Sequence, residues 1–169
     1  MKRIIFTSII MMFAVAAFSQ QIYNIKVSDR QDGTFEQYYG TVKVTGNILN
    51  GMKEGSWVEN HPNSELPHFI IQYKEGKKDG LYLEFDKQGN IVKKVDYKND
   101  MIDGMSHVWR KGGMLSVKQE YKAGQLHGLS MIYTDKGFIQ EESVYKEGKR
   151  DGMTIWYSYA DKQQGPKYV

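Results

Sequence analysis

The sequence predicts an all-β protein, an elongated single-layer antiparallel meander of stacked β-hairpin repeats with a period of about 24 residues. Three observations lead to this prediction. Gly80, Gly104, Gly128 and Gly152 are each separated by 24 residues. Between them, apolar and polar residues alternate with the period of two that is typical of β-strands. The chain of 169 residues has 17 Gly and 12 Tyr but only 3 Pro, as expected of short strands joined by glycine turns.

The N-terminus predicts an export signal. Met1–Arg3 is basic, Ile4–Phe18 is almost wholly apolar, and Ala17 and Ser19 are small residues at the two positions that a signal peptidase reads. We therefore expect residues 1–19 to be a signal peptide cleaved near Ser19, which leaves a secreted, periplasmic or cell-envelope protein. The apolar run is shorter than the roughly 20 residues of a bilayer-spanning helix, which disfavours an uncleaved anchor.

The next segment, residues 20–32, is expected to be an N-terminal strand, and residues 33–169 a repeat array with units that begin near residues 33, 55, 80, 104, 128 and 152. Within a unit, the residues one, three and five after the glycine are expected to form the packed face of a first strand. A glycine-containing turn such as 86–89 leads to a second strand such as 91–97. The repeat positions are Gly80, Phe85, Tyr97, Gly104, Trp109, Tyr121, Gly128, Tyr133, Tyr145, Gly152 and Tyr157.

The aromatic residue five positions after each unit glycine is interpreted as a ladder that stacks unit upon unit. Aromatic cross-strand pairs contribute about 0.2–1 kcal/mol each, which explains their recurrence without a ligand. A row of rings that binds sugars or apolar peptide groups is the alternative. Trp109 lies in the middle of the array, and we expect its replacement by alanine to cost about 3–5 kcal/mol.

The repeat sequence resembles the bacterial variant of the MORN-repeat family, including its YwqK-like antitoxin-type proteins. The resemblance is carried by Gly128–Tyr133, Asp135–Gly137 and Tyr145–Gly152, and it extends over roughly residues 33–169. It implies elongated single-layer sheets of stacked hairpins that serve as scaffolds and binding surfaces. It also implies an alternative function, that of an antitoxin.

The segment His61–His68 departs from the repeat, and its two prolines disfavour a regular ladder. Because an insertion is released from the packing that regular units must satisfy, we expect a partner to bind there. Three further aromatic residues lie off the face that is expected to pack. The candidate binding residues are therefore Trp57, His61, His68, Tyr82 and Trp156, and a loop without function is the equal alternative.

Other polar patterns favour structural roles. Asp79, Asp103 and Asp151 precede unit glycines, but one carboxylate per hairpin supplies too few of the about six to eight oxygen ligands that calcium takes. We interpret these residues as turn formers. The histidines are too scattered for a zinc site, and the absence of cysteine excludes disulfides, thiolate metal sites and cysteine nucleophiles. No nucleophile elbow, phosphate-binding loop or dinucleotide motif occurs, so we expect neither an enzyme nor a cofactor.

The charge pattern disfavours nucleic acid as a ligand. The formal net charge of +3 includes Lys2 and Arg3, which lie in the expected signal peptide, and no basic cluster follows. Together these observations predict an exported, non-enzymatic repeat protein that acts as a protein-binding or scaffold module. The alternatives are a toxin–antitoxin system antitoxin or immunity-type protein, and a module that binds cell-envelope glycan or lipid. We expect another protein as the partner, and no stable membrane insertion.

Overall fold

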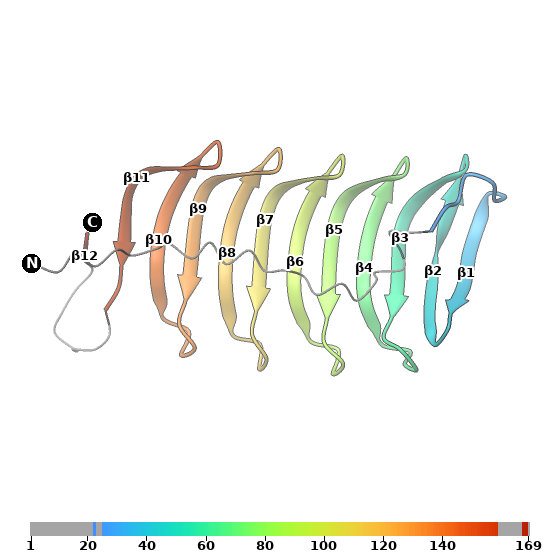
Figure 1. Cartoon of the computed structure of the whole chain (residues 1–169), viewed down its shortest axis with the longest axis horizontal. Helices are drawn as coiled ribbons and strands as arrows, with labels where there is room; N and C mark the ends of the chain where they lie inside the picture. Colours follow the sequence, from blue (N-terminus) through green and yellow to red (C-terminus); the bar gives the residue numbers. More distant parts are fainter. Residues whose placement is uncertain (1–21, 23–24, 159–166, 169) are drawn as a thin grey trace, which may run out of the picture.

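The computed structural model describes residues 22, 25–158 and 167–168. Within them, twelve strands pair in chain order in one antiparallel sheet. Figure 1 shows a single elongated layer with β1 at one end and β11 near the other. The strands are β1 (Gly33–Tyr39), β2 (Val42–Leu49), β3 (Met52–Asn60), β4 (Pro67–Lys74), β5 (Lys77–Phe85), β6 (Ile91–Lys98), β7 (Met101–Trp109), β8 (Leu115–Lys122), β9 (Gln125–Tyr133), β10 (Ile139–Lys146), β11 (Lys149–Trp156) and β12 (Lys167–Tyr168). The predicted fold class is confirmed.

The N-terminal part of the prediction has a different outcome. Residues 1–19 lie outside the described residues. Residues 25–32 do not form the expected strand, because β1 begins only at Gly33. Instead the amide of Arg30 donates to the carbonyl of Val27 in a turn, and Ile25 and Val27 are buried. Among the described residues, none belongs to a helix long and apolar enough to span a bilayer.

Two-residue turns connect consecutive units at one end of the strands. At Ala123 and Gly124, φ is 48° and 82°, so both residues adopt the left-handed conformation of a tight hairpin turn. The acidic residue before the unit glycine supports the next such turn, because Asp103 Oδ2 accepts the amide of Ala123 at 3.1 Å and Asp79 Oδ2 accepts that of Asn99 at 3.2 Å. The turn-forming role predicted for these two aspartates is confirmed.

The unit glycine is required by a recurring irregularity in the ladder. Gly104 pairs with Tyr121 inside β7, at a φ of 119°, beside a register shift in the pairing of β6 with β7. The carboxylate of Asp96 accepts the amide of Met105 at 2.9 Å. A Cβ on Gly104 would lie 2.9 Å from the Cβ of Asp96, so only glycine leaves this acceptor in place.

The face that packs is the one carrying the second residue after each unit glycine. The prediction that the residues one, three and five after the glycine form the packed face is wrong. Leu81, Leu83 and Phe85 are only half-buried, whereas Tyr82 is 5% exposed. We call this face the tyrosine face and the other the opposite face. The central row of the tyrosine face, assigned from the strand register, is Trp57, Ile71, Tyr82, Val95, Ser106, Gln119, Ser130, Ser143 and Thr154. All but the half-buried Gln119 are buried.

The hydrophobic core lies on the tyrosine face over β1 to β6. Figure 1 shows the segment before β1 beside β2 and β3, and its residues Ile22, Ile25 and Val27 join the core. Beyond Val95, the central row of the tyrosine face changes from large apolar side chains to serine, glutamine and threonine. Large apolar residues therefore line the tyrosine face from β1 to β6, and the N-terminal segment packs on part of it. The core consists of Ile22, Ile25, Val27, Phe35, Val44, Ile48, Trp57, Phe69, Ile71, Tyr73, Tyr82 and Val95.

Candidate functional site

Two further rows flank the central row of the tyrosine face. One carries Tyr73, Tyr97, Tyr121 and Tyr145, each of which pairs with a unit glycine. The other, read along the strand pairs from β5 to β11, is Glu84, Lys93, Val108, Val117, Ile132, Glu141 and Trp156. From β7 to β9 this face therefore combines a floor of small polar side chains with tyrosine on one side and aliphatic residues on the other.

Two charged side chains of β3 bind the backbone of Ile22 on the tyrosine face. The Ile22 amide donates to Glu59 Oε2 at 3.1 Å, and the Lys53 ammonium donates to the Ile22 carbonyl. Lys53 lies 5.2 Å from the ring centre of Tyr73 and 5.4 Å from that of Trp57. Burial lowers the pKa of Lys53 to about 8. We call Lys53 and Glu59 the main-chain clamp, because their charged groups bind the backbone N–H and C=O of one residue.

The next unit repeats the residues of this clamp. Lys78 lies two residues before Gly80, as Lys53 lies two before Gly55, and Glu84 lies four residues after Gly80, as Glu59 does after Gly55. The surroundings also repeat. Lys78 lies 4.4 Å from the ring centre of Tyr97, and burial lowers its pKa as it does that of Lys53. Tyr82, in the place of Trp57, donates its hydroxyl to Glu84 Oε2 at 3.2 Å.

Trp57 and Tyr82 are not free surface residues, contrary to the reasoning that nominated them. Trp57 is 0% exposed, its indole N–H donates to the carbonyl of Asn47 at 3.1 Å, and its ring centre lies 5.0 Å from that of Phe35. Tyr82 is 5% exposed and lies one row position beyond Ile71. The sequence pattern predicts packing on the opposite face, and the burial of Trp57 and Tyr82 shows that this prediction is wrong.

His61 and His68 do lie together. Their rings stack with centres 4.4 Å apart, and the ring of His68 lies tilted against that of Phe69 with centres 3.7 Å apart. His61 is only 7% exposed, and its Nε2 lies 3.1 Å from the carbonyl oxygen of Phe85. Burial and the neighbouring His61 lower the pKa of His68 to about 4. The two rings therefore pack the irregular loop against β4 and β5.

The hollow beside this histidine pair is shallow and mixed in character. It has a volume of about 430 Å³ and includes Glu84, Lys87 and Lys111 in its lining. Among the described residues, no three His, Asp or Glu side chains are grouped so that they could hold a metal ion. The hollow offers a stacked pair of imidazoles and scattered charges.

Trp156 lies far from the other nominated residues, on β11. Its indole N–H donates to Glu141 Oε2 at 3.0 Å, and the Arg150 guanidinium lies 5.7 Å from its ring centre. Arg150 also forms an ion pair with Glu141 at 2.7 Å. Trp156 shares the tyrosine face with Trp57 and Tyr82, but seven strands lie between β3 and β11.

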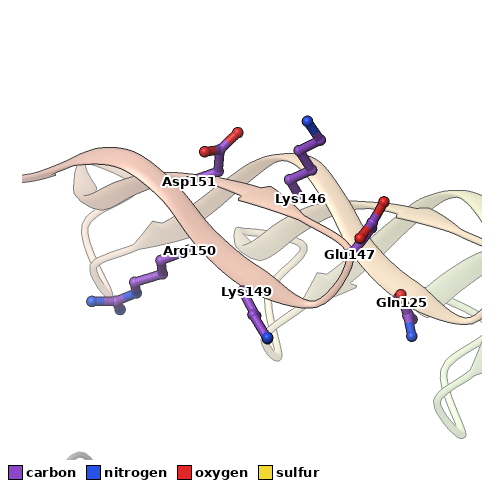
Figure 2. A pocket seen from close by; sticks show the side chains of 6 residues that line it. All are labelled: Gln125, Lys146, Glu147, Lys149, Arg150 and Asp151. Carbon is purple, nitrogen blue, oxygen red and sulfur yellow. The ribbon is translucent and has the colours of Figure 1, made fainter.

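A second hollow lies at the turn between β10 and β11. Figure 2 shows that its side chains point in different directions, with Lys146 and Asp151 on one side of the ribbon and Arg150 and Lys149 on the other. Charges of both signs alternate there, and no acid, base or nucleophile faces another across it. The lining residues are Gln125, Lys146, Glu147, Lys149, Arg150 and Asp151.

Sequence reasoning missed the clamp residues Lys53, Glu59, Lys78 and Glu84. A signal was present, because the later units carry aliphatic residues at the same offsets, Ile102 and Val108 and then Leu126 and Ile132. Charged residues at these two offsets in the units of Gly55 and Gly80 thus break the repeat. The fold and this face define an all-β hairpin-repeat protein with an open single-layer sheet. No family model and no curated protein sequence matches the chain.

Proposed function

We propose that the protein is an exported, non-enzymatic module that binds another protein or serves as a scaffold. The proposal rests on the half-buried aromatic and aliphatic side chains of the tyrosine face between β5 and β11. The described N-terminal segment joins the core over the first strands, while Tyr121, Val117 and Ile132 are half-buried side chains farther along the same face. Half-buried aromatic and aliphatic rows around a small polar floor suit contact with a protein chain.

The rigidity of the sheet supports this use. Each strand from β1 to β11 pairs with its neighbours along most of its length, so the three rows are held at fixed spacing. A preformed surface loses little conformational entropy on binding. In the described part of the chain, the titratable side chains of the two hollows do not converge on a reacting centre. This supports binding over catalysis.

Export and family are parts of the same proposal. The basic start, apolar run and small residues of Met1–Ser19 support cleavage by a signal peptidase. The turn pattern Tyr145–Gly152 supports kinship with MORN-repeat variants. Fractionation of expressing cells with N-terminal sequencing of the processed chain tests the compartment. A cytoplasmic protein that retains Met1 contradicts export.

The binding function is tested by capture with matched variants. Val117→Arg places a charge on the tyrosine face, and Met131→Arg places the same charge on the opposite face. The two wild-type side chains are both half-buried, so they form a matched pair. We expect a partner from the envelope fraction to be retained by wild type and Met131→Arg and lost with Val117→Arg. Equal retention by the two variants contradicts the proposal. A captured toxin encoded beside this gene would identify immunity as the specific form of protein binding.

A further inference from the structure

The opposite face carries three aromatic side chains, which we call the aromatic row. Phe85, Trp109 and Tyr133 hold the same position in three successive units, and all three are half-buried. They lie on β5, β7 and β9, so neighbouring members are two strand spacings, or about 9.6 Å, apart. Aromatic pairs have ring centres about 4.5–7 Å apart. In the described part of the chain, the ring that contacts Trp109 is that of His107, so the three aromatic rings do not cover one another.

A second row on this face carries positive charge. In the strand register Lys94 pairs with His107 and His107 pairs with Lys118, so two ammonium groups flank an imidazole across β6, β7 and β8. We call these three residues the basic row. Both lysines are half-buried, and the ion pairs among the described residues include neither of them. Burial and the two ammonium groups lower the pKa of His107.

The carboxylates on the same face lie on the other side of the basic row from the aromatic rings. Asp96 and Glu120 each follow a lysine of the row by two residues. The Asp96 carboxylate accepts the amide of Met105 at 2.9 Å, and the Glu120 carboxylate lies over Gly128. Both acidic groups are therefore directed toward the unit glycines, and the two ammonium groups remain available beside the aromatic row.

His107 links the two rows. Its ring stacks on that of Trp109, with centres 5.5 Å apart and planes 17° apart. Its Nδ1 is buried without a hydrogen-bond partner among the described residues. An unpaired buried polar atom is costly. A carboxylate bound between Lys94 and Lys118 would favour the protonated imidazole, in which both ring nitrogens are donors.

The two rows repeat with the same spacing along the sheet. Lys94 and Lys118 are two strands apart, as are Phe85 and Trp109, and Trp109 and Tyr133. This spacing is close to the length of one β-linked disaccharide. A polysaccharide in which acidic and neutral sugars alternate presents one carboxylate per disaccharide, and the C–H face of a sugar ring packs well on an aromatic ring. An open sheet surface suits such a long, extended ligand.

We propose that the opposite face from β5 to β9 binds an acidic, β-linked polysaccharide. The chain runs across the strands, its sugar rings pack on the aromatic row, and its carboxylates pair with Lys94 and Lys118. This surface is separate from the tyrosine face, so it adds a second binding function to the one proposed above.

The first test measures the Kd of a hyaluronan decasaccharide for the purified full chain by titration calorimetry. Hyaluronan alternates glucuronate with N-acetylglucosamine. We expect Lys94→Met combined with Lys118→Met to raise the Kd at least about tenfold, because two charge-assisted contacts are lost. The matched control is Lys98→Met with Lys122→Met, which removes the same charge from exposed positions of the same two strands and should bind as wild type does. Equal weakening by both double variants overturns the proposal.

Two other ligands separate the contributions of charge and sugar ring. A chitin decasaccharide has β-linked rings without carboxylates, and polyglutamate has carboxylates without sugar rings. We expect each to bind wild type at least about tenfold more weakly than hyaluronan does. Equal affinity for polyglutamate would show that charge alone is recognised, and equal affinity for chitin would show that the carboxylate is not. Either result overturns the proposal.

A nuclear magnetic resonance titration of the imidazoles tests the site without changing its lysines. A carboxylate bound beside His107 should raise its pKa, because it offsets the repulsion from Lys94 and Lys118. The pKa of His127 serves as the control, and His107→Gln assigns the signal. An unchanged pKa of His107 at saturating decasaccharide overturns the proposal.

The two proposed binding functions can fail independently. Val117→Arg, on the tyrosine face, should leave the Kd of the decasaccharide unchanged. If a partner protein is captured but no decasaccharide binds, the polysaccharide inference is wrong and the protein-binding function stands. If the decasaccharide binds through Lys94 and Lys118 but no partner is captured through Val117, the inference holds and the proposed function is wrong.

Discussion

Replacing Trp57 with alanine is the sharpest test of which face of the sheet packs. The indole is 0% exposed, contacts the rings of Phe35 and Tyr73 at 5.0 and 6.3 Å, and donates a hydrogen bond to Asn47. Removal of a fully buried aromatic side chain costs about 3–5 kcal/mol. With a urea dependence of about 2 kcal/mol per molar, the unfolding midpoint should fall by about 2 M.

Trp109 provides the matched comparison. It is half-buried on the opposite face, where its ring stacks on His107 at 5.5 Å. We therefore expect Trp109→Ala to cost about 1–2 kcal/mol, less than the repeat pattern alone predicts. Urea unfolding followed by far-ultraviolet circular dichroism measures both midpoints. If Trp109→Ala lowers the midpoint as much as Trp57→Ala or more, the assignment of the packed face is wrong.

A double-mutant cycle localises the effect to the contact itself. A Cβ on Gly46 would overlap the indole of Trp57, so Gly46→Ala should be destabilising in the wild type. In the Trp57→Ala background the space is vacant and most of this cost should disappear. A coupling energy of about 1–3 kcal/mol is expected. Additive costs would show that Gly46 is constrained by something other than the indole.

Three further predictions follow from the repeat and from the histidine pair. Asp103→Ala removes the acceptor for a turn amide and should cost about 1 kcal/mol, whereas Asp103→Asn keeps an acceptor and should recover most of the thermal stability. Gly104→Ala should cost more than Gly112→Ala by calorimetry, because both have positive φ but only the first meets a neighbour, Asp96. As pH falls from about 6.5 to about 4, the unfolded state should take up a proton before His68 in the folded state does, so stability should decline over that range. His68→Gln should reduce this slope in a pH series of urea midpoints, and an unchanged slope would contradict burial of a neutral imidazole.

Local features of the fold were predictable because their causes are local. The expected strand 91–97 corresponds to β6 at Ile91–Lys98, and the expected turn 86–89 joins β5 to it. Gly80, Gly104 and Gly128 all have positive φ, a backbone conformation that glycine adopts more readily than other residues, which explains why glycine recurs there. Alternation and glycine spacing act over a few residues, so they are visible in a single sequence.

The packed face was not predictable from alternation alone. Both faces of the repeat carry large side chains, and the pattern favoured Leu81, Leu83 and Phe85 over the row that contains Tyr82. The deciding contribution comes from Ile22, Ile25 and Val27, which cover the tyrosine face from outside the repeat. A segment that lies across strands leaves no periodic signal in its own sequence.

The candidate site was missed for the same reason. The contacts of the main-chain clamp join residues 31 and 37 positions apart, Lys53 to Ile22 and Ile22 to Glu59. Each charged residue alone is an ordinary polar position in a strand. Only the strand register reveals that Lys53 and Glu59 flank Trp57 on one face, and that Lys78 and Glu84 flank Tyr82 in the same way.

The most direct test of the account is photo-crosslinking in the native cell. A benzoylphenylalanine at Tyr121 reports on the tyrosine face, and one at Tyr133 reports on the opposite face with an equally half-buried aromatic position. The account predicts a covalent adduct with a partner protein from Tyr121 and none from Tyr133, with the Tyr121 adduct reduced by Val117→Arg. Adducts from Tyr133 alone, or equal adducts from both positions, would contradict binding through the tyrosine face.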